Sequence, residues 1–248
     1  MPSATATLTC SMGLTVTKSN ELIRASYKLT VNEQRLVLAC IAQLDPRKPI
    51  PKTREGDIRP IRVTVGDFAE TYQISDRSTA YTALQEATDR LYERDIKTYD
   101  ESGRRYGRFR WVQAVEYHQG QGYVELTFTQ RVVPYITLLH RQFTTYLLKQ
   151  IAQVNTIYAM RIFELLMQFK KTGVVVMSLD EFKLLLELED KYDRFSNLKA
   201  RVIEPAIKEL TDKAGLQIHW EPIRKKRTVT ALRFTFNEDP QTRLDFET

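Results

Sequence analysis

The chain has 248 residues, 42% of them apolar, and its 37 Lys and Arg residues against 31 Asp and Glu residues give a formal net charge of +6. This length is enough for one large core or for two domains of about 100–120 residues. No apolar run approaches the roughly 20 residues that cross a bilayer. Two cysteines, Cys10 and Cys40, are too few for a disulfide framework or for a zinc site on their own. We therefore expect a cytoplasmic protein with no membrane contact, no cofactor and no metal.

The first 15 residues, MPSATATLTCSMGLT, contain neither a basic segment nor a continuous apolar segment. A signal peptide needs both, so residues 1–15 are expected to be a disordered lead. The first helix is predicted over residues 30–44, because Thr30-x-x-Glu33 is a capping-box pattern and apolar residues, Cys40 among them, follow at helical spacing. After it we expect a Pro-rich loop over residues 45–60, a short strand over 61–65 and a helix over 67–72.

The next predicted helix spans residues 76–94, and Ser75 or Asp76 can cap it. Its buried face is predicted to hold Ala80, Leu84, Ala87 and Leu91. The outer face is polar but hardly cationic, which argues against direct reading of DNA bases. At the N-terminus of the helix, Arg77, Ser78 and Thr79 have free N–H groups that can bind phosphate, so we predict phosphate contacts there.

A β-hairpin is predicted next, with strands over residues 109–117 and 123–128 joined through residues 118–122. Two interpretations of this hairpin stay open. It either packs against another copy of the protein or forms an ordinary wing within its own domain, because exposed sheet edges are common at dimer surfaces without being diagnostic.

The second half of the chain repeats this plan. Its predicted elements are a helix over residues 155–171, a strand over 174–177, a helix over 179–188, a helix after Tyr192 and a terminal hairpin. Two helix openings are also alike, Val65-Gly66-Asp67-Phe68 and Ser178-Leu179-Asp180-Glu181-Phe182. A repeat spacing of roughly 110 residues is too long for a solenoid and indicates two copies of one module.

The helix after Tyr192, predicted over residues 193–210, has two distinct faces. Its apolar stripe is Phe195, Leu198, Val202, Ala206 and Leu210. Its opposite stripe is Arg194, Asn197, Arg201 and Lys208. Arg and Asn are the side chains best shaped to read guanine and adenine edges in a major groove. An ordinary surface helix with a solvated charged face is the alternative.

Two strands follow, over residues 217–223 and 228–236, and the turn between them is Arg224-Lys225-Lys226-Arg227. A helix followed by a hairpin with a basic tip is typical of a winged helix, in which the helix enters the major groove and the wing lies along phosphates. Four cations at a hairpin tip also occur in soluble turns and as guards against edge-to-edge aggregation.

Positive charge is concentrated in this region. Residues 191–233 contain eleven Lys and Arg against five Asp and Glu, so the local excess equals that of the whole chain. Such a field speeds association with DNA and makes the affinity fall steeply with salt, although it also attracts acidic membranes and acidic proteins.

Several motifs resemble those of iteron-binding plasmid replication initiators. At the N-terminus these are Val16-Thr-Lys-Ser-Asn-Glu-Leu-Ile23, Tyr27-Lys-Leu-Thr30 and Glu33-Gln-Arg35, and in the second half Arg201-Val-Ile-Glu-Pro-Ala-Ile-Lys-Glu-Leu210 resembles the second recognition helix of that family. The resemblance extends from Val16 to about Phe236. It implies an α+β fold of two tandem winged-helix domains, which the repeated plan relates by internal pseudo-symmetry.

The resemblance also implies a division of roles. Residues 16–140 would form a domain for dimerisation and auxiliary DNA contacts, residues 141–238 the main sequence-specific reader, and residues 239–248 a tail. In that family, monomers bind tandem origin repeats, here expected to be of roughly 20 base pairs, and dimers bind an inverted repeat in the operator and repress their own gene. The host initiator protein and the replicative helicase are the further expected partners.

The predicted DNA contacts follow from the helix and the wing. Base reading is assigned to Arg194, Asn197 and Arg201, and phosphate binding to Ser196, Lys199, Lys208, Arg224, Lys225, Lys226 and Arg227. Pro205 is expected to kink the helix or to begin a second helical segment, because it removes a backbone donor.

Two other classes compete with this interpretation. A rolling-circle nicking enzyme needs clustered His ligands beside a Tyr nucleophile, but His118, His140 and His219 lie far apart in the sequence. No G-x-x-x-x-G-K-[ST] loop occurs, so we expect no enzymatic activity. A transcriptional repressor with the same fold is harder to exclude, because fold does not determine function.

Overall fold

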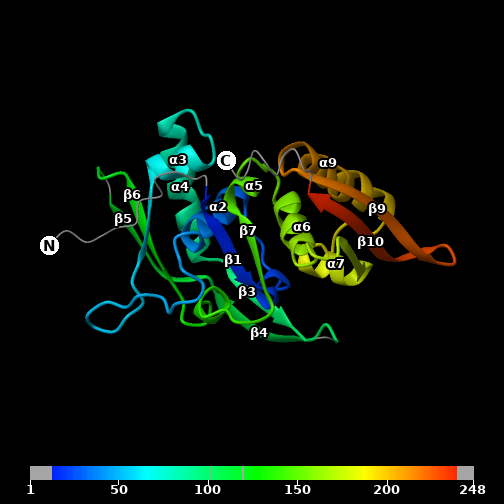
Figure 1. The fold of residues 1–248 in the computed structure, drawn as a ribbon, viewed down its shortest axis with the longest axis horizontal. Helices are drawn as coiled ribbons and strands as arrows, with labels where there is room; N and C mark the ends of the chain where they lie inside the picture. The colour runs from blue at the N-terminus through cyan, green and yellow to red at the C-terminus, as the bar shows by residue number, and fades with distance from the viewer. Residues whose placement is uncertain (1–12, 101, 119, 239–248) are drawn as a thin grey trace.

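The computed structural model describes residues 13–100, 102–118 and 120–238. Its two halves lie side by side along the longest axis (Figure 1). The lead expected at residues 1–15 falls mostly outside the described residues, but Thr15 begins a strand. The tail at residues 239–248 lies outside them altogether. No helix in the described part of the chain is both long enough and apolar enough to cross a membrane.

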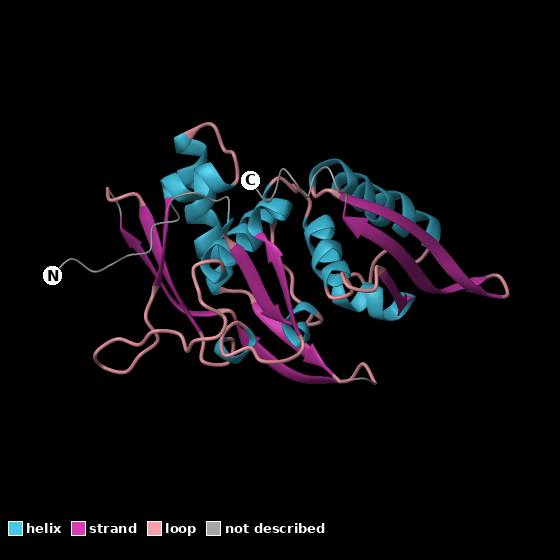
Figure 2. Cartoon of the chain, viewed as in Figure 1, coloured by secondary structure: helices cyan, strands magenta, loops and turns pink. Residues whose placement is uncertain are grey.

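Both halves contain the same succession of elements. In the first half it is α2 (Val31–Ile41), β2 (Ile61–Thr64), α3 (Val65–Thr71), α4 (Arg77–Tyr92), β5 (Val112–His118) and β6 (Tyr123–Phe128). In the second half it is α6 (Ile157–Met167), β8 (Val174–Ser178), α7 (Leu179–Leu185), a segmented helix, β9 (Leu216–Lys225) and β10 (Thr228–Glu238). The three-stranded sheets have the matching orders β2-β6-β5 and β8-β10-β9. Each half is therefore a winged helix, as predicted (Figure 2).

Side-chain caps begin the helices where the sequence indicated. Thr30 accepts from the Glu33 N–H and Glu33 accepts from the Thr30 N–H, which completes the predicted capping box of α2. Thr64 at the end of β2 and Ser178 at the end of β8 each cap the helix that follows. Both halves thus turn from strand to helix by the same device, and the predicted helix ends differ from the observed ones by only a few residues.

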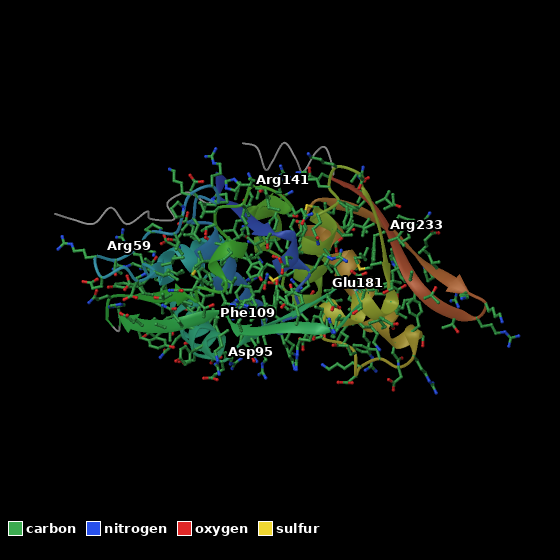
Figure 3. All side chains as sticks on the ribbon, turned by 90° about the horizontal axis from the view of Figure 1, so that it is seen from below. Arg59, Asp95, Phe109, Arg141, Glu181 and Arg233 are labelled. Atoms are coloured by element: carbon green, nitrogen blue, oxygen red, sulfur yellow. The ribbon has the colours of Figure 1, made fainter. Side chains whose placement is uncertain are left out.

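One hairpin was missed, and the boundary of another was wrong. β3 (Asp95–Tyr99) pairs with β4 (Arg105–Arg110) in a separate two-stranded sheet; the labelled Asp95 and Phe109 mark it in Figure 3. Phe109, predicted to begin the wing strand, is paired with Ile96 instead. The chain leaves β4 at Trp111, which is fully buried and packs edge-on against the Tyr27 ring. No turn residue marks this change of sheet, so strand periodicity alone could not reveal it.

The first strand of the chain pairs with a strand near the middle of the sequence, so the two ends of the N-terminal half lie side by side. β1 (Thr15–Ser19) pairs antiparallel with β7 (Phe143–Leu147). The domain boundary expected between residues 140 and 141 stays a prediction, but this pairing runs across it. The remaining short elements are α1 (Asn20–Ile23), a 3-10 turn (Val133–Tyr135) and α5 (Leu148–Ala152).

The two halves share one continuous hydrophobic core, to which α2, α6 and both three-stranded sheets contribute buried residues. Polar contacts join α7 and the residues just after it to the first half. The ammonium group of Lys97 on β3 lies 3.0 Å from the Glu187 carboxylate, and the Ser26 hydroxyl donates to the Leu184 carbonyl at 2.9 Å. Arg24 also pairs with Glu181 on α7, which Figure 3 labels.

Candidate nucleic-acid interface

The helix predicted over residues 193–210 is divided into three segments. These are α8 (Phe195–Leu198), a π-helical stretch (Lys199–Ile203) and α9 (Glu204–Lys213). Pro205 lies in the first turn of α9, which agrees with the expected second segment, because Pro lacks the N–H that a helix interior needs. Arg194 corrects the prediction: it is not on the helix but has an extended backbone just before α8.

Burial separates two faces of this helix much as predicted. Leu198, Val202, Ala206 and Leu210 are all at least 99% buried. Phe195 is only half-buried, and its ring centre lies 6.4 Å from that of Trp220 on β9. Arg194, Asn197 and Arg201, the expected base readers, are all exposed. The apolar face therefore anchors the helix while these three side chains are presented to solvent.

The exposed cations of the helix, and Arg194 just before it, differ in whether a carboxylate already pairs with them. Lys199 pairs with Glu204 at 3.3 Å and lies over the Trp220 ring, and Lys208 pairs with Asp212 at 2.6 Å. Among the described residues, no carboxylate lies within ion-pair distance of Arg194 or Arg201. These two guanidinium groups are therefore the ones available to an external anion.

The π-helical stretch also changes the position of Lys208. A π turn contains more residues than an α turn, so the residues after it are rotated about the axis relative to an uninterrupted helix. The stripe drawn from Arg194 to Lys208 on a regular helix is therefore not continuous in the structure. The assigned phosphate contact of Lys208 stays a prediction, with a carboxylate at 2.6 Å competing for the ammonium group.

The wing is longer and its turn tighter than predicted. Arg224 and Lys225 belong to β9, and the turn is only Lys226 and Arg227, because Lys225 pairs with Thr228. Lys226 has a φ of 58°, the left-handed conformation that two-residue hairpin turns require at their first position. All four side chains are exposed, and no described carboxylate pairs with them. The wing tip is thus an uncompensated positive charge at one end of the molecule (Figure 1).

An open hollow of about 960 Å³ lies between the helix and the wing. Its lining includes Ser196 and Lys199 from the helix region, Trp220 from β9, and Arg224 and Arg227 from the wing. Trp220 was not predicted to take part. It faces the helix because it alternates with Gln217, His219 and Glu221, a period-2 signal that the sequence does contain. Helix and wing thus line one concave surface of mixed charge, because Asp180, Asp193 and Glu204 also belong to the lining. The expected base readers Arg194, Asn197 and Arg201 are not part of it.

The N-terminal helix α4 presents a different surface. Arg77, Ser78 and Thr79 are exposed as expected. The prediction that their N–H groups are free is wrong for two of them, because Asp76 accepts from the Ser78 N–H at 3.4 Å and from the Thr79 N–H at 2.7 Å. The Thr79 hydroxyl also donates to Asp76, and these hydrogen bonds lower the pKa of the Asp76 carboxyl group. A phosphate that approached this end of α4 would find the Ser78 and Thr79 N–H groups already bound to the Asp76 carboxylate.

The fold, with its two matching three-stranded sheets, defines a protein of two tandem winged-helix domains. The chain belongs to the initiator replication protein family. Residues 15–167 match the family model described as Initiator Replication protein, WH1, and residues 178–236 match the model described as Initiator Rep protein, WH2.

The chain is also similar to two known proteins and to one solved structure. It is 32% identical over 210 residues to a replication initiation protein of Escherichia coli, covering 83% of this chain and 64% of the relative, so it spans just under two thirds of that protein. It is 24% identical over 254 residues to the PI protein of Escherichia coli, covering 89% and 81%. The crystal structure of Pi initiator protein in complex with iteron DNA has a similar fold, with a TM-score of 0.77, 23% identity and coverage of 92% of this chain and 99% of that one.

Proposed function

We propose that this protein is a plasmid replication initiator that binds tandem origin repeats, or iterons, in a sequence-specific manner. The observation that carries the proposal is the exposure of Arg194, Asn197 and Arg201 around a helix anchored by a buried apolar stripe, in the same domain as a wing tip of four unpaired cations. Membership of the initiator family and the similarity to a replication initiation protein support it.

The geometry suggests how the contacts divide. Arg and Asn side chains on a helix can donate to, and in the case of Asn also accept from, base edges in the major groove, which carries the full sequence code. The wing cations and Ser196 at the rim of the hollow suit phosphate oxygens, which position the protein without reading sequence. Lys199 and Lys208 contribute charge to the same field, but each must leave or share a carboxylate to do so.

The N-terminal winged helix is assigned the auxiliary contacts. Two modules on one chain can reach grooves about one helical turn apart, near 34–36 Å, which gives a recognition unit of roughly 20 base pairs. Because Asp76 occupies two N–H groups at the start of α4, contacts there depend on the Arg77 side chain and on the hydroxyl groups of Ser78 and Thr79 more than on the backbone.

The remaining parts of the proposal come from the family. The protein would act in the cytoplasm as a DNA-binding protein and not as an enzyme. Monomers would start replication, and homodimers would bind an inverted repeat and repress the protein's own promoter. The host initiator protein and the replicative helicase would be its partners at the origin.

A transcriptional repressor with the same fold is the competing function, because the basic surface suits an operator as well as an iteron. The arrangement of the bound sites separates the two. Tandem direct repeats favour an initiator, and a single inverted repeat at a promoter favours a repressor.

Selection of bound duplexes from a randomised DNA pool, with monomeric protein, tests the proposal. A salt titration follows on the selected duplex and on a scrambled control. We expect one motif near 20 base pairs, bound far more tightly than the control. Equal and strongly salt-dependent binding to both duplexes would reduce the protein to a non-specific basic binder and would contradict the proposal.

A further inference from the structure

The β5–β6 hairpin occupies in the N-terminal domain the topological position of the basic wing in the C-terminal domain. The two hairpins point to opposite ends of the molecule (Figure 1). Their chemistry differs. Near the tip of β5–β6 stand Glu116, His118 and Glu125, where the other wing has Arg224 to Arg227.

Strand pairing brings these three side chains together. Glu116 is the direct cross-strand partner of Glu125, and His118 lies two residues from Glu116 on the same strand and therefore on the same face. The His118 Nε2 atom is 3.1 Å from Glu125 Oε2 and 3.9 Å from Glu116 Oε2, and the three potential ligand atoms all lie within 4.8 Å of one another. Tetrahedral coordination at about 2.0–2.2 Å from each atom places the ligand atoms about 3.3–3.6 Å apart. The His118 and Glu125 atoms are already within that separation, and Glu116 has to move closer. The exposed Glu116 side chain is free to make that adjustment.

Neighbouring side chains hold two of the three groups in place. Arg62 on β2 binds Glu125 Oε1 with its Nε at 3.1 Å and its Nη2 at 3.0 Å, which leaves Oε2 directed at His118. The His118 ring stacks on the Tyr123 ring with a centroid distance of 4.2 Å. The Arg62 guanidinium lies 3.9 Å from the centre of the same Tyr123 ring. Outer-shell contacts of this kind orient ligands in metal sites.

The charge balance also favours a cation. Two carboxylates directly opposite each other on a sheet repel and destabilise the pair. Arg62 compensates Glu125, whereas the only described basic group within ion-pair distance of Glu116 is the His118 imidazole at 3.9 Å. A divalent ion between the three groups would neutralise the two carboxylate charges and remove the repulsion between them.

We propose that Glu116, His118 and Glu125 form a binding site for a divalent transition-metal ion of the zinc type. One imidazole and two carboxylates are suitable ligands for Zn²⁺ or Co²⁺, whereas Mg²⁺ and Ca²⁺ prefer oxygen ligands alone. Water would complete the coordination, because Glu116 lies on the exposed side of the hairpin. The sequence contains a signal for this site, the pattern Glu-x-His with a Glu opposite it in the same predicted hairpin. The spacing between the three histidines, considered by itself, does not reveal this signal.

Titration with Co²⁺ followed by displacement with Zn²⁺ tests the site, with calorimetry for affinity and the visible absorption of Co²⁺ for coordination. Cys10 is replaced by Ser throughout, because cysteine thiolates bind both ions. The matched control is His219→Gln. His219 and Glu221 form a similar pair on β9, but their partners on β10 are Thr235 and Arg233 and supply no third ligand.

We expect one ion per chain, an affinity lower by about tenfold or more in both His118→Gln and Glu116→Gln, and little change in His219→Gln. Glu116→Gln keeps the packing of the hairpin, since this side chain is 59% exposed, so a loss in that variant reports the ligand and not misfolding. If the two ligand variants bind Co²⁺ as tightly as the parent, or if His219→Gln loses as much affinity as they do, the proposed site is wrong.

Discussion

The Lys18 ammonium group donates a hydrogen bond to the Glu164 carboxylate at 2.5 Å, and both side chains are completely buried. Burial lowers the pKa of Lys18 even beside this carboxylate. For Glu164, burial acts to raise the pKa, but Lys18 and Arg161 outweigh it, and the pKa is lowered. Tyr146 donates to Glu164 at 2.7 Å, and Arg161 reaches the carbonyl groups of the N-terminal segment. This network joins β1 and β7 to α6 at the centre of the molecule.

Replacing Glu164 with Gln should therefore destabilise the protein strongly, because Lys18 and Arg161 would remain buried without a counter-charge. Breaking a buried pair in this way costs about 3–5 kcal/mol. The free energy of unfolding in urea measures it. The double variant Lys18→Met, Glu164→Gln removes one of the two orphaned cations and should recover part of the loss. Equal stability of the single variant and the parent would show that the network contributes little.

Acid should weaken a second contact, between α9 and the start of α6. Burial acts to raise the pKa of Glu209, but hydrogen bonds from the Thr156 hydroxyl at 2.6 Å and the Asn155 N–H at 2.7 Å, with Lys213, lower it below its ordinary value of 4.5. A carboxyl group whose pKa is depressed by folding stabilises the protein above its unfolded pKa, and that stability is lost as the pH falls through the folded pKa.

The matched variant is Glu209→Gln. At pH 7 its urea midpoint should lie below that of the parent, and the difference should shrink as the pH falls below 4.5, since the parent carboxyl group then becomes neutral as well. A difference that stays constant over this range would assign the effect to shape and not to charge.

Base reading and phosphate binding should separate in two DNA-binding variants. Arg201→Ala should cost about 1–3 kcal/mol on the selected sequence and relax sequence preference, whereas Lys226→Ala should weaken all duplexes alike and reduce the salt slope by about one. Lys226→Ala leaves the left-handed φ of 58° occupied by a non-glycine residue, so it changes charge without relieving the backbone. Equal losses of both variants on specific and random DNA would contradict this division.

Lysines that already form an ion pair within the chain should contribute less to DNA affinity than unpaired ones. Lys208 already binds Asp212 at 2.6 Å, whereas Lys226 has no described carboxylate partner. Lys208→Ala should therefore lower DNA affinity less than Lys226→Ala, because part of the gain from a phosphate is offset by loss of the existing pair. Fluorescence anisotropy at two salt concentrations compares them, and a larger effect of Lys208→Ala would place α9 closer to the DNA than we propose.

Cys40 should be unreactive in the folded protein. Its side chain is 0% exposed, and burial raises the pKa of its thiol, so the nucleophilic thiolate is rare at neutral pH. In a Cys10→Ser variant, a chromogenic disulfide reagent should react only after denaturant is added. Rapid reaction in buffer would show that α2 opens in the native state.

Local patterns in the sequence were enough to determine the winged-helix plan. Thr30 and Glu33 begin α2, the alternation of Leu232, Phe234 and Phe236 predicts the strand β10, and Pro205 predicts the second segment of the helix that precedes the C-terminal wing. Each of these features depends on neighbours within a few residues, so backbone sterics and helix or strand periodicity alone could reveal them. The concentration of positive charge in residues 191–233 is likewise a property of composition.

Only the tertiary structure decided which charged groups are available. The β5–β6 register places Glu125 against His118, and Lys97 of the first half pairs with Glu187 of the second half. The Lys18–Glu164 pair joins residues 146 positions apart. Charges interact over distances in space and not along the chain, so their partners, and with them the residues free to bind DNA or metal, follow from packing between distant segments.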